Sequence, residues 1–416
     1  MKKALTLTVL AAASGACLAQ AATPGTVSVY GIADAGLTHT TGLSSNKNQL
    51  VSGIMEGSRF GLRGNEDIGG GWRALFVLEH RLEINNGTGS NRPPSSPQVV
   101  PDRLNQAALL GLPGALQPAV SGVAASIGAT VGVNLGNTFW DRQAYVGLVT
   151  PFGAVLAGRQ YTPAYEVQAA FDTMGTQSSL AAGQVASLPG GFDIRMNNAL
   201  QYRIQLGGIT ASAMYAFGTV PGNSKANRFG GAMAMYKTGN LAVGLGYNQR
   251  NNDIGLESLK SLAVGASLAI GPGTVSAMYA KIEDDNPSGV STITASLTPL
   301  VGAGGAALVQ SAFTTALRQD AQLLHLGYKM TTGPNTFYVT YTSFNDRKAA
   351  NADVASYGVA YTYALSKRTD LNAVLAHYNN KGLGQAAPGQ AGFLGGVTSS
   401  AGTDSNNVAF GIRHRF

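Results

Sequence analysis

The chain has 416 residues, and its 28 Lys and Arg against 21 Asp and Glu give a net charge of +7. Only 12% of the residues are charged and 55 are glycines, whereas a globular domain averages about 25% charged residues. So little charge, with no long helical pattern, argues against a helical or α/β enzyme. The aromatic content argues against intrinsic disorder.

The N-terminus predicts a secretory signal peptide over residues 1–21. Lys2 and Lys3 precede an apolar run over residues 4–13, and Ala19-Gln20-Ala21 fits the small-x-small cleavage rule. Cleavage before Cys17, as in a lipoprotein, is the alternative, but the leucine expected ahead of such a site is missing. The predicted mature chain, 22–416, keeps 26 basic and 21 acidic residues, a net charge of +5, and has no cysteine to form a disulfide.

Sixteen segments of the mature chain alternate large apolar residues with small, polar or charged ones. In residues 241–247, for example, Leu241, Val243, Leu245 and Tyr247 are separated by alanine and glycine. This period of two predicts β-strands, although a few segments are assigned by spacing alone. The predicted strands are 27–38, 50–64, 72–84, 142–150, 154–161, 197–206, 209–217, 229–237, 241–250, 259–270, 274–283, 320–330, 336–345, 353–365, 371–379 and 407–416.

The two faces of these strands predict a membrane protein. A soluble sandwich packs large side chains inward, but here the second face is small, polar or charged, which fits a water-filled interior with the apolar face in lipid. Lipid cannot hydrogen-bond an open sheet edge, so the sheet must close. We therefore predict an all-β, 16-stranded antiparallel transmembrane β-barrel. In its closing strand Val408, Phe410 and Ile412 face lipid, while Arg413 and Arg415 face the lumen.

The predicted strands alternate between short turns and long connections. The longest connections lie near 85–141, 162–196 and 284–319. Leu104–Trp140 and Asn286–Leu317 contain no charged residue, but both are broken by Gly and Pro. Neither offers the roughly 20 solidly apolar residues of a membrane-spanning helix, and we predict that both are loops.

The motifs of secreted enzymes and metal sites are missing from the sequence. It contains no H-E-x-x-H, Walker A or G-x-S-x-G motif. The histidines are scattered, without the spacing of metal ligands, and we interpret each as an interfacial or surface residue; they are His39, His80, His325, His377 and His414. We therefore predict no catalytic residue, no metal and no cofactor.

The informative charges are arginines on the second face of the strands. Arg59 and Arg63 lie opposite Phe60 and Leu62, and an arginine facing lipid at the midplane costs roughly 2–4 kcal/mol. These arginines are therefore expected in the lumen, although they could do no more than solvate it. The complete predicted basic wall is Arg59, Arg63, Arg142, Arg159 and Arg195.

The connection over 162–196 is the candidate for the opposite side of a constriction. It carries Glu166, Asp172 and Asp193 among small and aromatic residues. If this loop folds into the barrel, its carboxylates would face the arginine wall. The field across such a constriction orders water and solutes, and an excess of positive charge raises the local concentration of anions.

Several motifs resemble the general diffusion porins of Gram-negative bacteria, especially the β-proteobacterial type. Residues 58–71, S-R-F-G-L-R-G-N-E-D-I-G-G-G, resemble the second strand and first turn of that family. Phe152-Gly153 followed by Gly158-Arg159-Gln160-Tyr161 resembles the strand that leads into its constriction loop. Val27–Gly31 resembles its first strand, and the terminal Phe416 resembles its assembly signal.

The resemblance implies a homotrimer of sixteen-stranded barrels in the outer membrane, each with its third outer loop folded into the lumen. Arg59 and Arg159 match family wall arginines by position, and Arg63, Arg142 and Arg195 match less closely. Glu166 and Asp172 fall within the matching loop. The resemblance also implies contacts with outer-membrane lipid and lipopolysaccharide, and with the barrel assembly machinery through Phe416, but none with nucleic acid.

The function that the resemblance implies is passive diffusion of small hydrophilic solutes and ions, without catalysis. The cationic bias of the predicted wall adds a weak preference for anions to this prediction. The connections 85–141 and 284–319 are longer than their family counterparts. They could cover the mouth, pack on a neighbouring subunit or bind a partner. A substrate-specific channel, and an adhesin or receptor barrel that acts through these loops, therefore stay open as alternatives.

Overall fold

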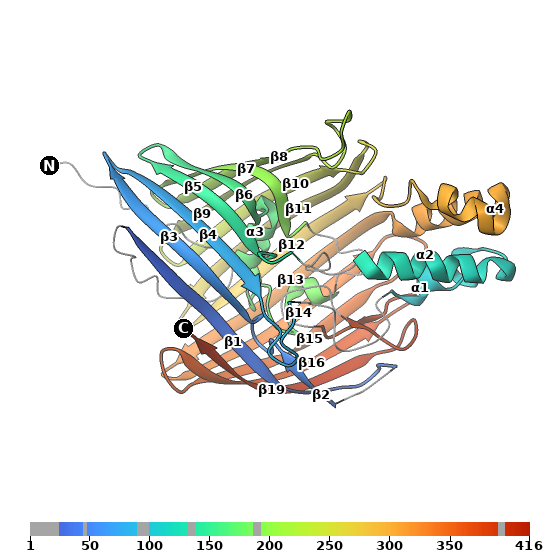
Figure 1. Cartoon of the computed structure of the whole chain (residues 1–416). Coiled ribbons are helices and arrows are strands. Elements are labelled where there is room, and N and C mark those ends of the chain that lie inside the picture. The colour runs from blue at the N-terminus through green and yellow to red at the C-terminus, as the bar shows by residue number, and fades with distance from the viewer. Residues whose placement is uncertain (1–24, 45–47, 90–99, 131–137, 186–192, 390–395) are drawn as a thin grey trace.

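The chain forms a barrel whose first and last long strands pair with each other. The computed structural model describes all residues except 1–24, 45–47, 90–99, 131–137, 186–192 and 390–395. The predicted signal peptide thus lies outside the described residues. The described chain builds one antiparallel sheet of 17 segments, closed where β1 pairs with β19. Figure 1 shows the tilted strands from the side.

The bounds of the elements are as follows. The sheet contains β1 (Thr26–Thr40), β2 (Asn48–Ser52), β3 (Arg59–Gly69), β4 (Trp72–Arg81), β5 (Gln143–Thr150), β6 (Gly153–Tyr161), β7 (Arg195–Leu206), β8 (Ile209–Ala216), β9 (Phe229–Thr238), β10 (Leu241–Asn251), β11 (Glu257–Ile270), β12 (Gly273–Asp284), β13 (Gln319–Thr332), β14 (Asn335–Asp346), β15 (Val354–Ala364), β16 (Thr369–Asn380) and β19 (Ser405–Arg415). The short strands β17 (Ala386–Ala387) and β18 (Gly396–Val397) pair separately. The helices are α1 (Asp102–Asn105), η1 (Ala108–Leu110), η2 (Gly114–Leu116), α2 (Gln117–Thr130), α3 (Pro163–Phe171), η3 (Ala182–Val185) and α4 (Ile293–Leu317).

The second predicted strand, 50–64, is interrupted in the structure. Both β2 and β3 pair with β1, so they form one broken strand, and the 17 segments make a barrel of sixteen strands. The prediction of a continuous strand was wrong over 53–58, where the chain leaves the sheet. The other predicted strands are present, with bounds that differ by a few residues.

The break is stabilised by the carboxylate of Asp34 on β1. Its oxygens accept the backbone N–H groups of Ile54, Met55 and Glu56, at 2.8, 2.9 and 2.8 Å. The side chain of Asp34 is completely buried. A buried carboxylate needs such donors, and the three N–H groups need an acceptor because they have left the sheet ladder.

The two faces of the sheet differ as predicted. Val27 and Val29 on β1 are 63% and 65% exposed, whereas Asp34, of the opposite parity, is buried. The same alternation recurs on β10, where Leu241 and Leu245 are exposed and Gly244 is buried. A band of exposed, large apolar side chains therefore surrounds a polar or small-residue interior.

The closing strand β19 follows the predicted orientation. Phe410 and Ile412 are exposed and Arg413 is buried. At its end Phe416 exchanges two backbone hydrogen bonds with Gly31, at 3.0 and 3.1 Å. A Cβ atom at Gly31 would lie 2.3 Å from the Phe416 ring, so glycine is required where the terminal aromatic crosses β1.

The two uncharged connections are helical, which corrects the prediction that both are loops. One contains α1 and α2, and the other contains the 25-residue α4. Gly302 inside α4 has a non-helical conformation, with φ 71° and ψ 166°. Glycines inside α2 and the interruption of α4 make each helix weak in isolation. The packing of their apolar faces on each other therefore stabilises them.

These helices pack on each other and form what we call the helical cap. Its buried apolar residues are Val100, Leu104, Ala107, Leu116, Ala119, Val120, Val123, Ala124, Val290, Ile293, Leu297, Ala306, Val309, Phe313 and Leu317. In Figure 1 the cap extends beyond the strand ends, at the end of the barrel opposite the C-terminus. By length and composition α4 is apolar enough to cross a membrane.

We expect Asp34→Ala to destabilise the barrel. Each buried N–H group left without an acceptor costs about 1–3 kcal/mol, and the substitution removes the acceptor of three such groups. Refolded protein can be heated in detergent and the transition followed by the gel mobility of the folded form. Asp67→Ala, at an exposed carboxylate, is the matched control, and equal transitions for the two variants would contradict the role given to Asp34.

Candidate functional site

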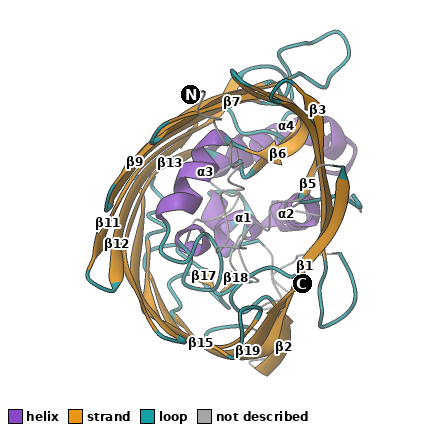
Figure 2. Ribbon diagram, turned by 90° about the vertical axis from the view of Figure 1, so that its left-hand side faces the viewer, coloured by secondary structure: helices purple, strands orange, loops and turns teal. Residues whose placement is uncertain are grey.

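The connection between β6 and β7 packs on the inner face of the barrel wall. Its helix α3 contacts β9, β10, β11 and β12, and Figure 2 shows α3 inside the ring of strands. A Cβ atom at Gly244 or Gly265 would come within 2.6 Å of the Phe171 ring. The small residues of this face, which predicted a wet interior, here make room for a helix.

Two carboxylates of this connection pair with arginines outside the predicted wall. Glu166 accepts two hydrogen bonds from Nη1 of Arg203, both 2.8 Å long. Asp193 lies 2.7 Å from Nη1 of Arg250. The pKa of both carboxyl groups is raised, because burial outweighs the opposite effect of the neighbouring arginine. These ion pairs tie the two ends of the connection to β7 and β10.

The third carboxylate, Asp172, organises the loop itself. It accepts the backbone N–H groups of Met174 and Ala182, at 2.9 and 2.8 Å, and burial raises its pKa. One oxygen lies 3.8 Å from Nε2 of His325 on β13. The interpretation of His325 as a surface residue was wrong, since it is completely buried and its Nε2 accepts the N–H of Thr173.

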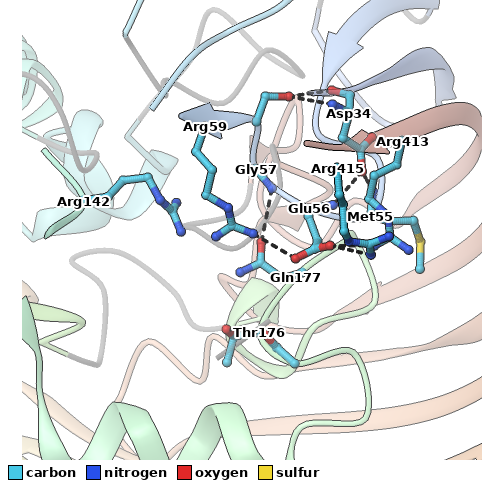
Figure 3. A network of polar contacts seen from close by, with 12 residues as sticks. Asp34, Met55, Glu56, Gly57, Arg59, Arg142, Thr176, Gln177, Arg413 and Arg415 are labelled. Atoms are coloured by element: carbon cyan, nitrogen blue, oxygen red, sulfur yellow. Dashed lines mark hydrogen bonds and ion pairs between the residues drawn. The ribbon is translucent and has the colours of Figure 1, made fainter. Parts of the chain in front are cut away.

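The predicted wall arginines therefore do not pair with the predicted loop carboxylates, but contact other groups. Nη2 of Arg59 lies 2.8 Å from Glu56, which stands in the break between β2 and β3. Glu56 also binds Arg413 and Arg415 of the closing strand, each at 2.9 Å. Both of these arginines reach Asp370 on β16 as well. This network joins β3, β16 and β19 through the break between β2 and β3, where β1 closes the barrel. Figure 3 shows the contacts of Glu56 with Arg59, Arg413 and Arg415.

Arg142 and Arg195 belong to a second group. Nε of Arg142 lies 2.6 Å from Glu79, which also accepts the hydroxyl of Tyr30 at 3.1 Å. Nη2 of Arg142 and Nη2 of Arg195 each donate to the hydroxyl oxygen of Tyr161, both at 3.0 Å. The group therefore places two cations around one phenol on the inner wall.

The remaining wall arginines contact uncharged groups. Arg63 lies over the ring of Tyr30, 5.1 Å from its centroid. Arg159 donates to the backbone carbonyl of Asp141 and to the amide oxygen of Asn197, both at 2.6 Å. Because these contacting groups carry no formal charge, the two arginines leave the wall with an excess of positive charge.

The tip of the loop presents uncharged polar groups toward this wall. The hydroxyl groups of Thr176 and Tyr165 form a hydrogen bond. The side-chain carbonyl oxygen of Gln177 accepts a hydrogen bond from the backbone N–H of Gly57, at 3.3 Å. Thr176 and Ser178 have φ angles of 62° and 72°, which are unfavourable for residues with a Cβ atom. In Figure 3, Arg59 and Arg142 extend toward the segment that carries Thr176 and Gln177.

Glu56 and Arg250 were not predicted as residues of this site, and Arg203, which stands at the end of a predicted strand, was not included in the wall. Glu56 stood inside an apparently continuous strand. Arg203 and Arg250 share the inward parity of the predicted wall without any motif around them, and parity could have identified Arg250. Glu56 could be found only from the break that Asp34 stabilises.

Among the described residues, no group of three or more His, Cys, Asp or Glu side chains could hold a metal ion. The arrangement consists of ion pairs and hydrogen bonds around a lumen. Its chemical capacity is to attract, order and select solutes by charge.

Another buried carboxyl group, that of Glu83, lies two residues after the end of β4. Glu83 is 3.9 Å from Arg81, which also contacts Asp141 at 3.7 Å. Burial raises the pKa of Glu83 to about 7, against the opposing effect of Arg81. The carboxyl is therefore neutral below that pH in the folded chain and charged above it.

Comparison with known proteins gives consistent matches. The family model described as Gram-negative porin matches residues 6–383. Outer membrane porin protein 32 of Delftia acidovorans is 26% identical, with both chains covered completely. An outer membrane porin protein of Bordetella pertussis is also 26% identical, over 98% of this chain and 99% of that one.

Solved structures share the fold. The anion-selective porin from Comamonas acidovorans superposes with a TM-score of 0.66 and 21% identity, over 94% of this chain and 100% of that one. The trimer form of OmpT, an outer membrane protein of Vibrio cholerae, gives a TM-score of 0.56 and 14% identity, over 95% of this chain and 100% of that one.

The titration of Glu83 predicts a pH dependence. Between the ordinary carboxyl range and about pH 7 the folded chain holds a proton that the unfolded chain has lost, so this group's contribution to stability falls as the pH rises through that window. Over the same window the interior gains one negative charge. We expect the ratio of anion to cation permeability through the lumen to be up to about two-fold higher at pH 6 than at pH 8.

Reversal potentials in planar bilayers at the two pH values would measure this change. Glu83→Gln should remove the step and hold the channel at its low-pH preference. A pH step of the same size in Glu83→Gln would assign the titration to another group.

Proposed function

The chain belongs to the Gram-negative porin family and forms an outer-membrane channel for passive diffusion, and from this premise we propose that its constriction prefers anions weakly. The proposal is based on which charged side chains pair with each other in the lumen. The arginine wall faces a loop tip of hydroxyl and amide groups, while Glu166 and Asp193 are bound to Arg203 and Arg250 elsewhere. A cationic wall opposite a neutral loop raises the local concentration of anions.

The connection that carries α3 is proposed as the constriction loop. Its contacts support this role, since Phe171 packs on Gly244 and Gly265, and Asp172 and Thr173 contact His325 on the neighbouring β13. Apolar packing and buried hydrogen bonds on the side of β9–β16 leave the polar tip toward Arg59 and Arg142. The proposed path for solutes therefore lies on the side of Arg59 and Arg142.

We also propose a homotrimer, which the trimer form of the Vibrio cholerae relative supports. The exposed apolar band would face lipid and neighbouring subunits, and lipopolysaccharide would surround the outer ends of the strands. Phe416 is proposed as the contact of the barrel assembly machinery. Its ring is 51% exposed at the strand terminus, where another protein can reach it.

A second role, as receptor or adhesin, is favoured by the helical cap. No charged residue occurs over 104–140 or 286–317, and Leu300 of α4 is 75% exposed. Viewed along the barrel, α1 and α2 lie within the outline of the ring (Figure 2), and from the side they extend past its end (Figure 1). The cap therefore stands over the mouth, where it can both restrict entry and contact a partner.

Arg63→Gln combined with Arg159→Gln should reduce the anion-to-cation permeability ratio about two-fold or more, because each substitution removes one charge whose contacts are neutral. The measurement is the reversal potential across a salt gradient in planar bilayers. Lys367→Gln, in an exposed turn, removes a charge away from the lumen and serves as the control. An unchanged ratio in the double variant would refute the proposed constriction.

Replacing residues 287–316 by a short Gly/Ser linker should raise the single-channel conductance without changing ion selectivity. The barrel should tolerate the replacement because Asp284 and Gln319 are paired neighbours at the ends of β12 and β13. A deletion of residues 221–223, in the connection between β8 and β9, controls for loop shortening. If conductance stays the same while binding to cells or surfaces is lost, the cap acts in attachment and not in permeation.

A further inference from the structure

Tyr161 stands at the point where the wall and the constriction loop meet. It is the last residue of β6, and its partner in the β6–β7 register is Arg195, the first residue of β7. The connection that carries α3 therefore begins at Tyr161 and ends at Arg195. Arg142, one residue before β5, approaches the same hydroxyl from a third strand.

Two guanidinium groups converge on the single oxygen of this side chain. Nη2 of Arg142 and Nη2 of Arg195 each lie 3.0 Å from it. Both arginines are buried, and like charges repel strongly where water is scarce. A group that accepts a hydrogen bond from both cations lowers the cost of holding them together.

Each arginine has a second contact that fixes its direction. Arg142 is held from the other side by Glu79, at 2.6 Å. Arg195 lies over the ring of Tyr161, 4.6 Å from its centroid, where the negative face of the ring attracts a cation. The hydroxyl oxygen is the contact that the two arginines share.

The ring and the oxygen of Tyr161 have separable tasks. The ring stacks on that of Tyr165 in α3, with centroids 5.2 Å apart and planes 19° from parallel. Stacking and the cation–ring contact need only the aromatic carbons. Phenylalanine at this position would keep both of them and remove the shared acceptor.

We propose that the hydroxyl of Tyr161 is a positioning group that holds Arg142 and Arg195 side by side and thereby sets the ion selectivity of the channel. The inference rests on the proposed anion preference. Two adjacent cations concentrate positive potential at one place on the inner wall, whereas the same cations turned apart spread it along the wall. Tyr161 thus acts through the arginines and does not need to touch the solute.

The test compares Tyr161→Phe with Tyr165→Phe. We expect Tyr161→Phe to lose about half of the reversal potential, while the protein still folds and the single-channel conductance is unchanged. Tyr165→Phe removes a different hydroxyl, the one bonded to Thr176, and keeps the stacked rings. It should leave the reversal potential unchanged.

A double variant distinguishes a positioning role of Tyr161 from a merely structural one. If Tyr161 acts through Arg195, Tyr161→Phe combined with Arg195→Gln should show the reversal potential of Arg195→Gln alone. Independent, additive losses would overturn the proposal. So would a wild-type reversal potential in Tyr161→Phe.

The failure of this inference can be told apart from the failure of the proposed function. If Arg63→Gln with Arg159→Gln changes selectivity and Tyr161→Phe does not, the cationic wall stands and the positioning role falls. If neither changes it, the anion-preferring constriction is itself refuted.

Discussion

Closure of the sheet is the constraint on which the rest of this molecule depends, and a buried carboxylate at the seam organises it. A barrel in lipid cannot leave a strand edge unpaired. Asp34 lies on the strand that receives the chain terminus, and its oxygens bind three N–H groups of the neighbouring strand where that strand leaves the sheet. The excursion carries Glu56 inward to Arg413 and Arg415 of the closing strand. One break in a strand therefore supplies the ion pairs that join the first and last parts of the chain.

The same logic explains the electrostatics of the lumen. A carboxylate buried next to two or three guanidinium groups is stabilised by them, so acidic residues here serve mainly to hold structure. Glu56, Glu79 and Glu166 each pair with arginine at 2.9 Å or less. Because these acids are occupied in fixing strands and loop, the positive charge of the wall is only partly balanced. In the proposed constriction, selectivity would follow from how these ion pairs balance the charges of the wall.

The interior combines a channel with a packed core. On the side of β9–β16, glycines on the strands admit α3, and Phe171 and Leu180 join an apolar cluster that includes Met233 and Tyr378. Packing of this kind holds a loop far more firmly than hydrogen bonds to water. The arginines lie on the opposite wall. A rigid loop backed by apolar contacts keeps a constant distance to charged groups, which selection by charge requires.

The alternation of residues determined much of this structure without any tertiary information. Strand identity, the outward apolar face and the inward direction of Arg413 follow from a period of two, because each strand of a barrel repeats the same choice between lipid and lumen. The family motifs predicted a constriction loop and a wall of arginines, and the role of both stays a prediction. Contacts between distant residues decided the rest. The break at Glu56 needs Asp34, the partners of Glu166 and Asp193 depend on where the loop lies against β7 and β10, and the cap helices form because two uncharged connections, apart in sequence, bury one another. Pairings of this kind leave no local period, so only the folded chain specifies them.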